Sequence, residues 1–462
     1  MKKVAIIGAG SLVFARKLTC DILQYEDLRD THFALVDTDE ERLRFASRIM
    51  ERIIAERAPD ATYSASTNRR DVLADCDFVI ISILVGGYEA IESEIDIPKK
   101  YGVSQAVGDT LTPGGVMRCL RTLPELVAMA KDIEELCPTA HVLNYTNPMG
   151  MLSRGIMEAS PELTYVGLCH SVQGTLGEWA NRLDIPEDEI AYTAAGINHT
   201  AWFIRMERDG EDLLPRVREC AYDPAVWLGD TARSEYVKHF GYPVTESSGH
   251  NSEYVPWFRK DDETVEKYCP GGNWNGEHGW IKKLYSRNDW REQMERMASG
   301  EDELPADQSR EYGSRIIHAI ATGESELIYG NVLNGGCILN LPADACVEVP
   351  CYIDRTGINP IKVGALPEHL AAVNRMELNV QSLAVKAAQT ADPEVVFQAM
   401  ALDPLTSMAC TLDEIRAMTR ELLEAHRPWL PAFEGKRLEE KKVMVGCTAN
   451  DVEEHIDPSQ EQ

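Results

Sequence analysis

The sequence predicts an α/β protein in which a parallel sheet is followed by a second lobe of mixed α+β structure. Three observations support this prediction. Apolar strands alternate with helical stretches over the first 150 residues, a glycine-rich turn follows the first strand, and the alternation is lost after about residue 196. Strands and helices that alternate along a chain form parallel sheets with right-handed crossovers.

The expected strands of the parallel sheet are continuous apolar runs, as strands buried on both faces require. They are VAIIGAG (4–10), HFALVD (32–37), DFVIISI (77–83), HVLNYTNP (141–148) and TYVGLC (164–169). Helices are expected between them at 15–25, 41–57 and 121–136. The clearest is 41–57, where apolar side chains recur on one face with helical spacing.

The second lobe is expected to begin near residue 196. Residues 197–210 (INHTAWFIRMERDG) are expected to form a longer strand that ends in a turn. A helix at 310–322, a pair of strands at 330–354 and a long helical region at 366–389 follow. We therefore predict two packed lobes, 1–195 and 196–450, and a polar tail at 451–462.

Composition excludes several classes of partner. Lys and Arg total 46 against 75 Asp and Glu, a net charge of −29, which opposes binding to nucleic acid or to an anionic membrane surface. No run of 18 apolar residues could span a bilayer. The 12 cysteines form no C-x-x-C pair, which favours a reduced, cytoplasmic compartment.

A short glycine motif predicts a dinucleotide site. Gly8 and Gly10 flank an alanine directly after the first strand, where the turn of a Rossmann-like fold lets the backbone approach a pyrophosphate at a helix N-terminus. Asp37 ends the second strand, 27 residues beyond Gly10, and a carboxylate there favours NAD over NADP. We assign both glycines, Ser11 and Asp37 to this site. Val13 replaces the third glycine of the fingerprint, and the alternative is a helix-packing glycine pair with Asp37 as a helix N-cap.

Polar residues accumulate at the ends of the later strands. They are Asp109 in VGDTLTPGG, Asn147 in NYTNPMG, the run from Cys169 to Ser171, and His199. The carboxyl ends of parallel strands face the crevice in which α/β folds bind ligands. Cys169 and His199 could hold one divalent ion and leave positions open for a substrate. Their spacing leaves open the alternatives of a buried small cysteine and a capped loop histidine.

At these residues the sequence resembles glycoside hydrolase family 4, and most closely its α-galactosidase (melibiase) branch. The resemblance runs from residue 3 to about residue 430. The motifs that carry it are VAIIGAGS, VGDTLTPGGVMR, LNYTNPM, GLCHSVQGT, AGINHTAW, NVLNGGCILNLPADACVEVP and ALDPLTS. It implies a lactate/malate dehydrogenase-like architecture that uses NAD and a divalent ion, usually Mn²⁺.

The resemblance also implies a reaction and the residues that carry it. NAD removes hydride from C3 of the sugar, the aglycone is eliminated across C1–C2, water adds, and the hydride returns. Cys169 and His199 match the metal ligands, and Asn147 matches a substrate-binding asparagine. His170 matches the proton donor to the leaving group, and Asp109 matches an acid that supports the base.

The base at C2 is less well defined by the resemblance. Family members use a Tyr or an Asp in the region that corresponds to YPVTESSGHNSEYVPWF (242–258), and this segment contains no Asp. We choose Tyr254 as the base and keep Glu246 as the reserve. The alternative for Tyr254 is an ordinary aromatic side chain that packs within the lobe.

Departures from the family pattern indicate an unphosphorylated α-galactoside as the substrate. Ile91 stands where phospho-sugar members carry a basic residue, and Cys-His-Ser is the galactosidase form of the metal motif. An α-galacturonide is one alternative, because Arg118 and Arg121 could bind a C6 carboxylate. An α-glucoside is the other alternative within the family. A plain NAD-dependent dehydrogenase of hydroxy acids is a further alternative of a different class.

The remaining features are expected to have no catalytic role. The Trp-rich stretch 271–280 reads equally as a sugar-stacking loop or as a loop that packs on its own lobe. His250 and His278 are interpreted as surface or loop histidines. Amphipathic helices near the C-terminus suggest a homodimer or homotetramer.

Overall fold

The computed structural model describes residues 1–11, 14–269 and 289–441. The described residues form one twelve-stranded sheet. Its first half consists of six parallel strands in the order β3-β2-β1-β4-β5-β6, the strand order of the Rossmann fold. These strands are β1 (Lys3–Ile7), β2 (His32–Val36), β3 (Thr62–Ser66), β4 (Phe78–Ile81), β5 (His141–Asn144) and β6 (Thr164–Gly167). The α/β fold class predicted from the sequence is confirmed.

The second half of the sheet is antiparallel. After β6 the order continues as β10-β11-β7-β8-β9, and β12 pairs with β11. The strands are β7 (Ala191–Ile197), β8 (Thr200–Arg208), β9 (Glu211–Asp212), β10 (Glu326–Leu333), β11 (Cys346–Asp354) and β12 (Gly357–Pro360). The pair predicted at 330–354 is the β10–β11 hairpin. The single strand predicted at 197–210 is wrong in its first three residues, because β7 ends at Ile197 and His199 turns the chain with a φ of 67°.

Helices cover the parallel part of the sheet. Those in the first half of the chain are α1 (Phe14–Gln24), α2 (Glu40–Arg57), α3 (Gly87–Lys100), α4 (Thr112–Leu136), α5 (Met149–Ala159) and α6 (Ser171–Leu183). The helix predicted at 121–136 begins nine residues earlier, at Thr112. Pro113 stands in the first turn, where backbone N–H groups have no partner within the helix, so the lack of an N–H in proline costs no hydrogen bond.

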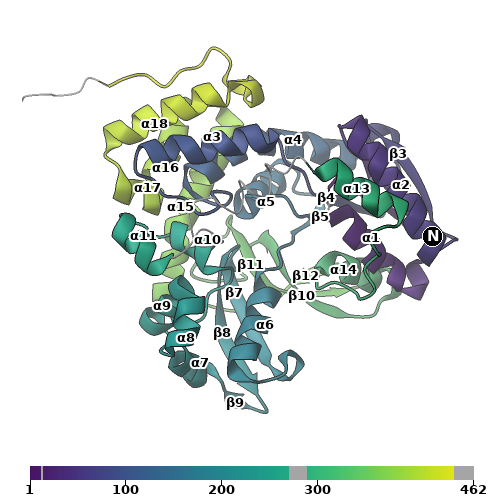
Figure 1. Cartoon of the computed structure of the whole chain (residues 1–462), viewed down its shortest axis with the longest axis horizontal. Coiled ribbons are helices and arrows are strands. Elements are labelled where there is room, and N and C mark those ends of the chain that lie inside the picture. The colour runs from purple at the N-terminus through teal and green to yellow at the C-terminus, as the bar shows by residue number, and fades with distance from the viewer. Residues whose placement is uncertain (12–13, 270–288, 442–462) are drawn as a thin grey trace, which may run out of the picture.

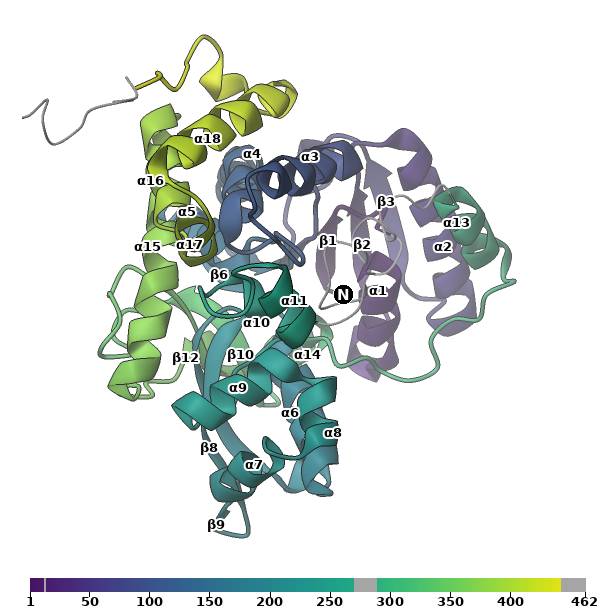
Figure 2. The same cartoon turned by 60° about the vertical axis from the view of Figure 1, so that its left-hand side comes forward.

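Two groups of helices from the second half of the chain lie apart in Figure 1 and Figure 2, with α10 between them. One group holds α7 (Leu214–Cys220), α8 (Pro224–Gly229) and α9 (Thr231–Phe240), and the other holds α15 (Glu368–Thr390), α16 (Pro393–Ala401), α17 (Pro404–Ala409) and α18 (Leu412–Ala425). The helix α10 spans Ser248–Glu253 and α11 spans Asp262–Tyr268. The helices predicted at 310–322 and 366–389 are α14 (Tyr312–Thr322) and α15.

The chain returns to its N-terminal part after residue 289. α13 (Trp290–Ser299) packs against α2, where Arg48 pairs with Glu295 at 2.6 Å, and α14 packs against α1 (Figure 1). β7 also spans residue 195 within the continuous sheet. The division into lobes at 195 and the boundary at 450 stay predictions. The stretch 271–280, His278 and the predicted tail at 451–462 lie outside the described residues.

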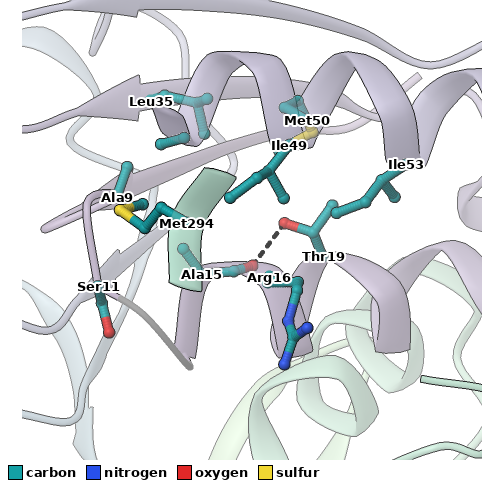
Figure 3. Close-up of a pocket in the computed structure, with 11 residues that line it drawn as sticks. Ala9, Ser11, Ala15, Arg16, Thr19, Leu35, Ile49, Met50, Ile53 and Met294 are labelled. Carbon is teal, nitrogen blue, oxygen red and sulfur yellow. Dashed lines mark hydrogen bonds between the residues drawn. The ribbon is translucent and has the colours of Figure 1, made fainter. Parts of the chain in front are cut away.

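A cavity of about 20 Å³ lies between α1, α2 and α13 (Figure 3). Ile49, Met50, Ile53 and Met294 line it together with the side of α1, in which the Thr19 hydroxyl donates to Ala15 O at 2.8 Å. This volume holds about one water molecule, so the cavity is a packing defect and cannot accept a sugar. Among the helices of the described ranges, none combines the length and the hydropathy that a bilayer crossing requires.

Candidate active site

The glycine turn after β1 is held by backbone hydrogen bonds and by Asp37. Gly8 has a φ of +91°, which favours glycine, and its N–H donates to Val36 O at 2.9 Å. The N–H of Gly10 donates to Asp37 Oδ2 at 2.8 Å. A Cβ on Gly10 would lie 2.6 Å from the same carboxylate oxygen, so the turn approaches Asp37 closely. The structure thus brings together Gly8, Gly10 and Asp37, and Ser11 follows in the same turn with its N–H on Gly8 O at 3.1 Å.

The alternative interpretation of Asp37 as a helix N-cap is wrong. Asp39 caps α2, because its side chain accepts from the N–H groups of Glu41 and Arg42. The carboxylate of Asp37 instead faces the glycine turn and accepts the N–H of Asp39 at 3.0 Å through its other oxygen. Asp37 is therefore available at the edge of the turn, where a bound ribose would lie in a Rossmann-like fold.

Cys169 and His199 come from separate strands and meet at one point. Cys169 follows β6, and His199 occupies the turn between β7 and β8. The distance from Cys169 Sγ to His199 Nε2 is 3.4 Å, and Glu246 Oε2 lies 3.6 Å from the same nitrogen. One ligand atom of each of the three residues lies within 4.8 Å of the other two. Metal–ligand distances of about 2.0–2.4 Å place neighbouring ligands roughly 3–3.5 Å apart, so the donor set fits a single cation.

The ionisation of these groups also suits a cation site. Burial lowers the pKa of His199 to about 4, although Glu246 raises it, so the imidazole is neutral at pH 7 and keeps a lone pair. Burial raises the pKa of the Cys169 thiol, and the nearby carboxylate of Glu246 raises it further. A cation between the two side chains would favour the thiolate, the form in which cysteine binds metals.

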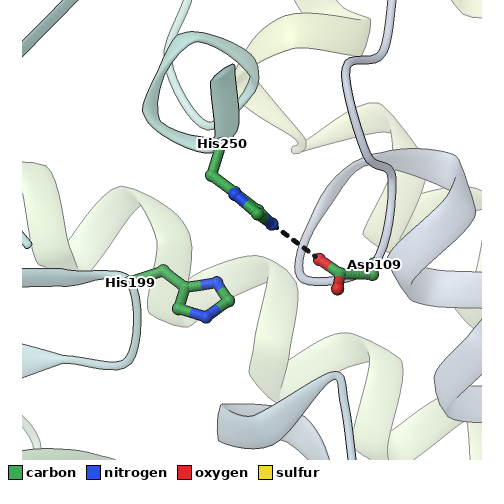
Figure 4. Close-up of side chains that lie close together, drawn as sticks. All are labelled: Asp109, His199 and His250. Carbon is green, nitrogen blue, oxygen red and sulfur yellow. Dashed lines mark ion pairs between the residues drawn. The ribbon is translucent and has the colours of Figure 1, made fainter. Parts of the chain in front are cut away.

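A second group of possible ligands shares His199 (Figure 4). His250 Nε2 lies 3.6 Å from Asp109 Oδ1, and His250 Nδ1 lies 3.2 Å from Glu246 Oε1. Burial lowers the pKa of His250, but the carboxylates of Glu246 and Asp109 raise it well above its usual range. The interpretation of His250 as a surface or loop histidine is wrong, because its side chain is buried in α10 and bridges two acids.

Tyr254 lies on the other side of the His199 ring. Its hydroxyl is 3.1 Å from His199 Nδ1, and Thr110 Oγ1 is 2.9 Å from the same nitrogen. The Thr110 hydroxyl also donates to Asp109 Oδ1 at 2.8 Å. These contacts leave His199 Nε2 directed at Cys169 and Glu246. Burial raises the pKa of Tyr254 well above its usual range, and the carboxylates of Asp109 and Glu253 add to this shift.

Asn147 and His170 complete the set predicted from the sequence. Asn147 Nδ2 donates to Asp109 Oδ2 at 3.4 Å, and Asn147 Oδ1 has no hydrogen-bond partner within the described residues. His170 is exposed and directly precedes α6, next to Cys169 in the chain. The structure therefore gathers all the predicted catalytic, metal and substrate residues around one point, while their roles stay predictions.

Glu253 is a residue of this region that the sequence did not reveal. Its buried carboxylate accepts three backbone N–H groups of the loop that carries Asp109: Ala106 at 2.6 Å, Val107 at 3.1 Å and Gly108 at 3.1 Å. It directly precedes Tyr254 and thereby ties the two elements together. Its only sequence signal is an acid beside a candidate tyrosine, which is too common to be informative.

We expect Glu253→Ala to lower the free energy of unfolding by about 3 kcal/mol, because three buried N–H groups would lose their acceptor. Urea unfolding followed by circular dichroism measures this change. Glu266→Ala, at an exposed position of α11, is the control and should change stability by less than about 0.5 kcal/mol. Equal effects of the two substitutions would contradict an anchoring role for Glu253.

Comparison with known proteins identifies the family. The family model described as "Family 4 glycosyl hydrolase" matches residues 3–185, and the model of its C-terminal domain matches residues 194–406. An α-galactosidase of Bacillus subtilis is 40% identical over 438 residues, which cover 94% of this chain and 100% of the relative. An α-galactosidase of Rhizobium meliloti is 37% identical, with 93% of this chain and 89% of the relative covered.

Further similarities extend this result. An α-galacturonidase of Lachnoclostridium phytofermentans is 30% identical, with 93% of this chain and 97% of the relative covered. The solved structure of a 6-phospho-β-glucosidase from Thermotoga maritima with manganese, NAD⁺ and glucose-6-phosphate shares the fold, with a TM-score of 0.76 and 20% identity over 92% of this chain and 99% of that chain. The chain is a glycosidase and belongs to family 4 of the glycosyl hydrolases, as the resemblance of its motifs predicted.

Proposed function

We propose that this glycosidase hydrolyses unphosphorylated α-galactosides with the help of NAD and a divalent cation, Mn²⁺ in the first place. The observation that carries the proposal is the meeting of Cys169 and His199, at the ends of β6 and β7, with Glu246 from the segment before α10. The order β1-β4-β5-β6 separates the glycine turn from Cys169 by three strand spacings, roughly 14 Å, which a dinucleotide can bridge. Hydrolysis by oxidation and elimination needs the dinucleotide site and the cation site close enough for both to reach one sugar.

The residues of the glycine turn fit NAD. The positive φ of Gly8 gives the tight turn after β1, and the absence of a side chain at Gly10 lets this turn pack against Asp37 and Arg42, as expected of the dinucleotide-binding turn of a Rossmann-like fold. The carboxylate of Asp37 favours ribose hydroxyls over a 2′-phosphate. The 6-phospho-β-glucosidase of Thermotoga maritima was solved with NAD, which supports the same use here.

We expect Asp37→Ala to weaken NAD binding about 10- to 100-fold, because two hydrogen bonds to the ribose would be lost. Quenching of tryptophan fluorescence by NAD, or calorimetry, measures the Kd directly. Asp39→Ala is the matched control, since Asp39 caps α2 two residues away and should leave the Kd within about threefold. An unchanged Kd in the Asp37 variant would place the cofactor elsewhere.

We assign the following roles to the chain's own residues, and their positions support the assignment. When bound, NAD would exchange a hydride with C3 of the sugar, and the cation would stabilise negative charge on the C2 and C3 oxygens. Tyr254 is the base that removes the C2 proton, with Asp109 beside it. His170, exposed beside Cys169, protonates the leaving oxygen as the C1–O bond breaks. Asn147 binds a sugar hydroxyl through its unpartnered oxygen.

The contacts of Arg118 and Arg121 bear on whether the sugar carries a carboxylate at C6. Arg118 and Arg121, which could have bound a uronate carboxylate, are buried beside Glu94, and both form ion pairs with it. Both guanidinium groups are therefore engaged by Glu94, whose single carboxylate balances one of their two charges. Ile91 is fully buried, so no cation stands at the position expected of phospho-sugar members. These contacts favour a galactoside over a galacturonide or a 6-phosphate.

A panel of nitrophenyl glycosides tests the proposal. With NAD, Mn²⁺ and a thiol, we expect kcat/KM for the α-galactoside to exceed that for the α-glucoside and the α-galacturonide at least about 100-fold. A chelator should stop the reaction, and NADH should not accumulate. Preference for the galacturonide would identify the 30%-identical relative as the better guide. Stoichiometric NADH would indicate net oxidation of the sugar, as in a dehydrogenase, instead of hydrolysis.

The compartment and the assembly are also part of the proposal. All eleven cysteines of the described ranges are free, which fits a reducing, cytoplasmic environment. Helices near the C-terminus expose apolar side chains, among them Leu402 and Leu412, which fits a homodimer or homotetramer. Light scattering of the purified protein measures the assembly.

A further inference from the structure

Two buried polar residues, Asn331 and Glu348, stand at the junctions of the sheet. β10 joins β6 through the pair Asn331 and Gly167, and β11 joins β7 through the pair Glu348 and Gly196. Asn331 and Glu348 also face each other across the β10–β11 hairpin. The four residues therefore form one row across the sheet, and within the described registers these are the only pairs that connect the hairpin to β6 and β7.

The row ends beside both proposed metal ligands. Cys169 lies two residues after Gly167, and His199 lies three residues after Gly196. With two strands between them, β6 and β7 are separated by three strand spacings, roughly 14 Å. The two side chains nevertheless converge to 3.4 Å at the strand ends. The width of the row is the distance from Gly167 on β6 to Gly196 on β7. A small change in this width would therefore separate Cys169 from His199.

Hydrogen bonds fix the width of the row. Asn331 Nδ2 donates to Gly167 O at 3.3 Å and to Glu348 Oε1 at 3.2 Å, and both side chains are fully buried. A Cβ on Gly167 would lie 3.0 Å from Asn331 Cβ, so only glycine allows this approach. The hydrogen bond from Asn331 to Glu348 joins the two strands of the hairpin within the row.

The charge state of Glu348 agrees with a structural bridge. Burial raises its pKa to about 8, and the nearby amides of Asn331 and Asn198 lower it only in part. A neutral acid adds no repulsion against the carboxylate of Glu246. Glutamine has the same shape and no charge, so it should replace Glu348 with little loss.

We propose that Asn331 and Glu348 are positioning residues that set the distance between Cys169 and His199 and thereby the affinity for the divalent cation. The proposal rests on the metal site of the proposed function and assigns a role to the segment 330–350, which that function leaves without one. Residues that orient metal ligands typically change metal affinity 10- to 100-fold when they are removed.

Binding of Mn²⁺ to the purified full-length protein tests the proposal. Titration with MnCl₂, followed by the electron paramagnetic resonance signal of free Mn²⁺, gives the Kd without any turnover. We expect Asn331→Leu and Glu348→Ala to raise the Kd at least about tenfold and Glu348→Gln to keep it within about threefold. Glu348→Asp shortens the side chain but keeps the carboxyl, so its Kd for Mn²⁺ should lie between those of the alanine and glutamine variants. This variant remains informative if Glu348→Ala does not fold.

Val347→Ala is the matched control. Val347 is fully buried, adjacent to Glu348 on β11, and paired with Val332 rather than with the row. The loss of two buried methyl groups in Val347→Ala should lower Tm, while the Kd for Mn²⁺ stays within about threefold of the wild-type value. An unchanged Kd in folded Asn331→Leu and Glu348→Asp, or an equal rise in Val347→Ala, would overturn the positioning role. A wild-type protein that binds no Mn²⁺ would instead refute the metal site, and the inference with it.

Discussion

Replacement of Cys169 with serine is expected to lower kcat for α-galactoside hydrolysis at least about a thousandfold while the Kd for NAD stays within about twofold. Serine preserves the size of the side chain, but its hydroxyl does not ionise near neutral pH and cannot supply the thiolate. The cation would then lose one of the three donors gathered at His199. The glycine turn lies across three strand spacings and should be unaffected. Nitrophenol release and a fluorescence titration with NAD measure the two quantities.

Cys119→Ser provides the control for this experiment. Cys119 is fully buried in α4 and is not among the described groups of possible metal ligands. We expect its variant to lose some stability but to keep the Mn²⁺ requirement and at least about half of the wild-type kcat. A Cys169 variant with more than about a tenth of the wild-type activity and an unchanged Mn²⁺ Kd would contradict the metal assignment.

Much of the parallel sheet could be predicted because its strands are buried on both faces. Runs such as VAII and FVII have no other stable environment in a protein of this size. β3 was missed for the opposite reason, since TYSAS forms the edge of the sheet, is partly exposed and has no apolar run. The start of α4 was missed because the glycines at 114 and 115 disfavour a helix, and burial of that turn outweighs their low propensity.

The site could be predicted only where strand ends determine it. Cys169 and Asn147 follow parallel strands, so their convergence follows from the topology alone. Glu246, His250 and Glu253 come from a loop and the short helix α10 that follows it, and no hydrophobic period in this segment places it against the sheet. Their positions depend on long-range contacts such as the three N–H groups that bind Glu253.

Replacement of Tyr254 with phenylalanine is expected to lower kcat about 10²- to 10⁴-fold, the usual contribution of a general base. Phenylalanine keeps the buried ring and removes only the hydroxyl that lies 3.1 Å from His199 Nδ1. Because the metal-facing nitrogen of His199 is Nε2, the Kd for Mn²⁺ should stay within about threefold. In D₂O, the rate at which C2-deuterated galactose forms should fall in proportion to kcat.

Glu246→Gln separates the two candidates for the base. Glu246 lies 3.6 Å from His199 Nε2 and contacts His250, so we place it among the cation's ligands and expect its variant to raise the Mn²⁺ Kd at least about tenfold. Saturating Mn²⁺ should then restore part of the activity in Glu246→Gln but none in Tyr254→Phe, because only the first substitution weakens binding of the cation. If Tyr254→Phe retained full turnover and full deuterium incorporation, the proton at C2 would have to leave through another group, and Glu246, the nearest remaining carboxylate on the metal side of His199, would become the base.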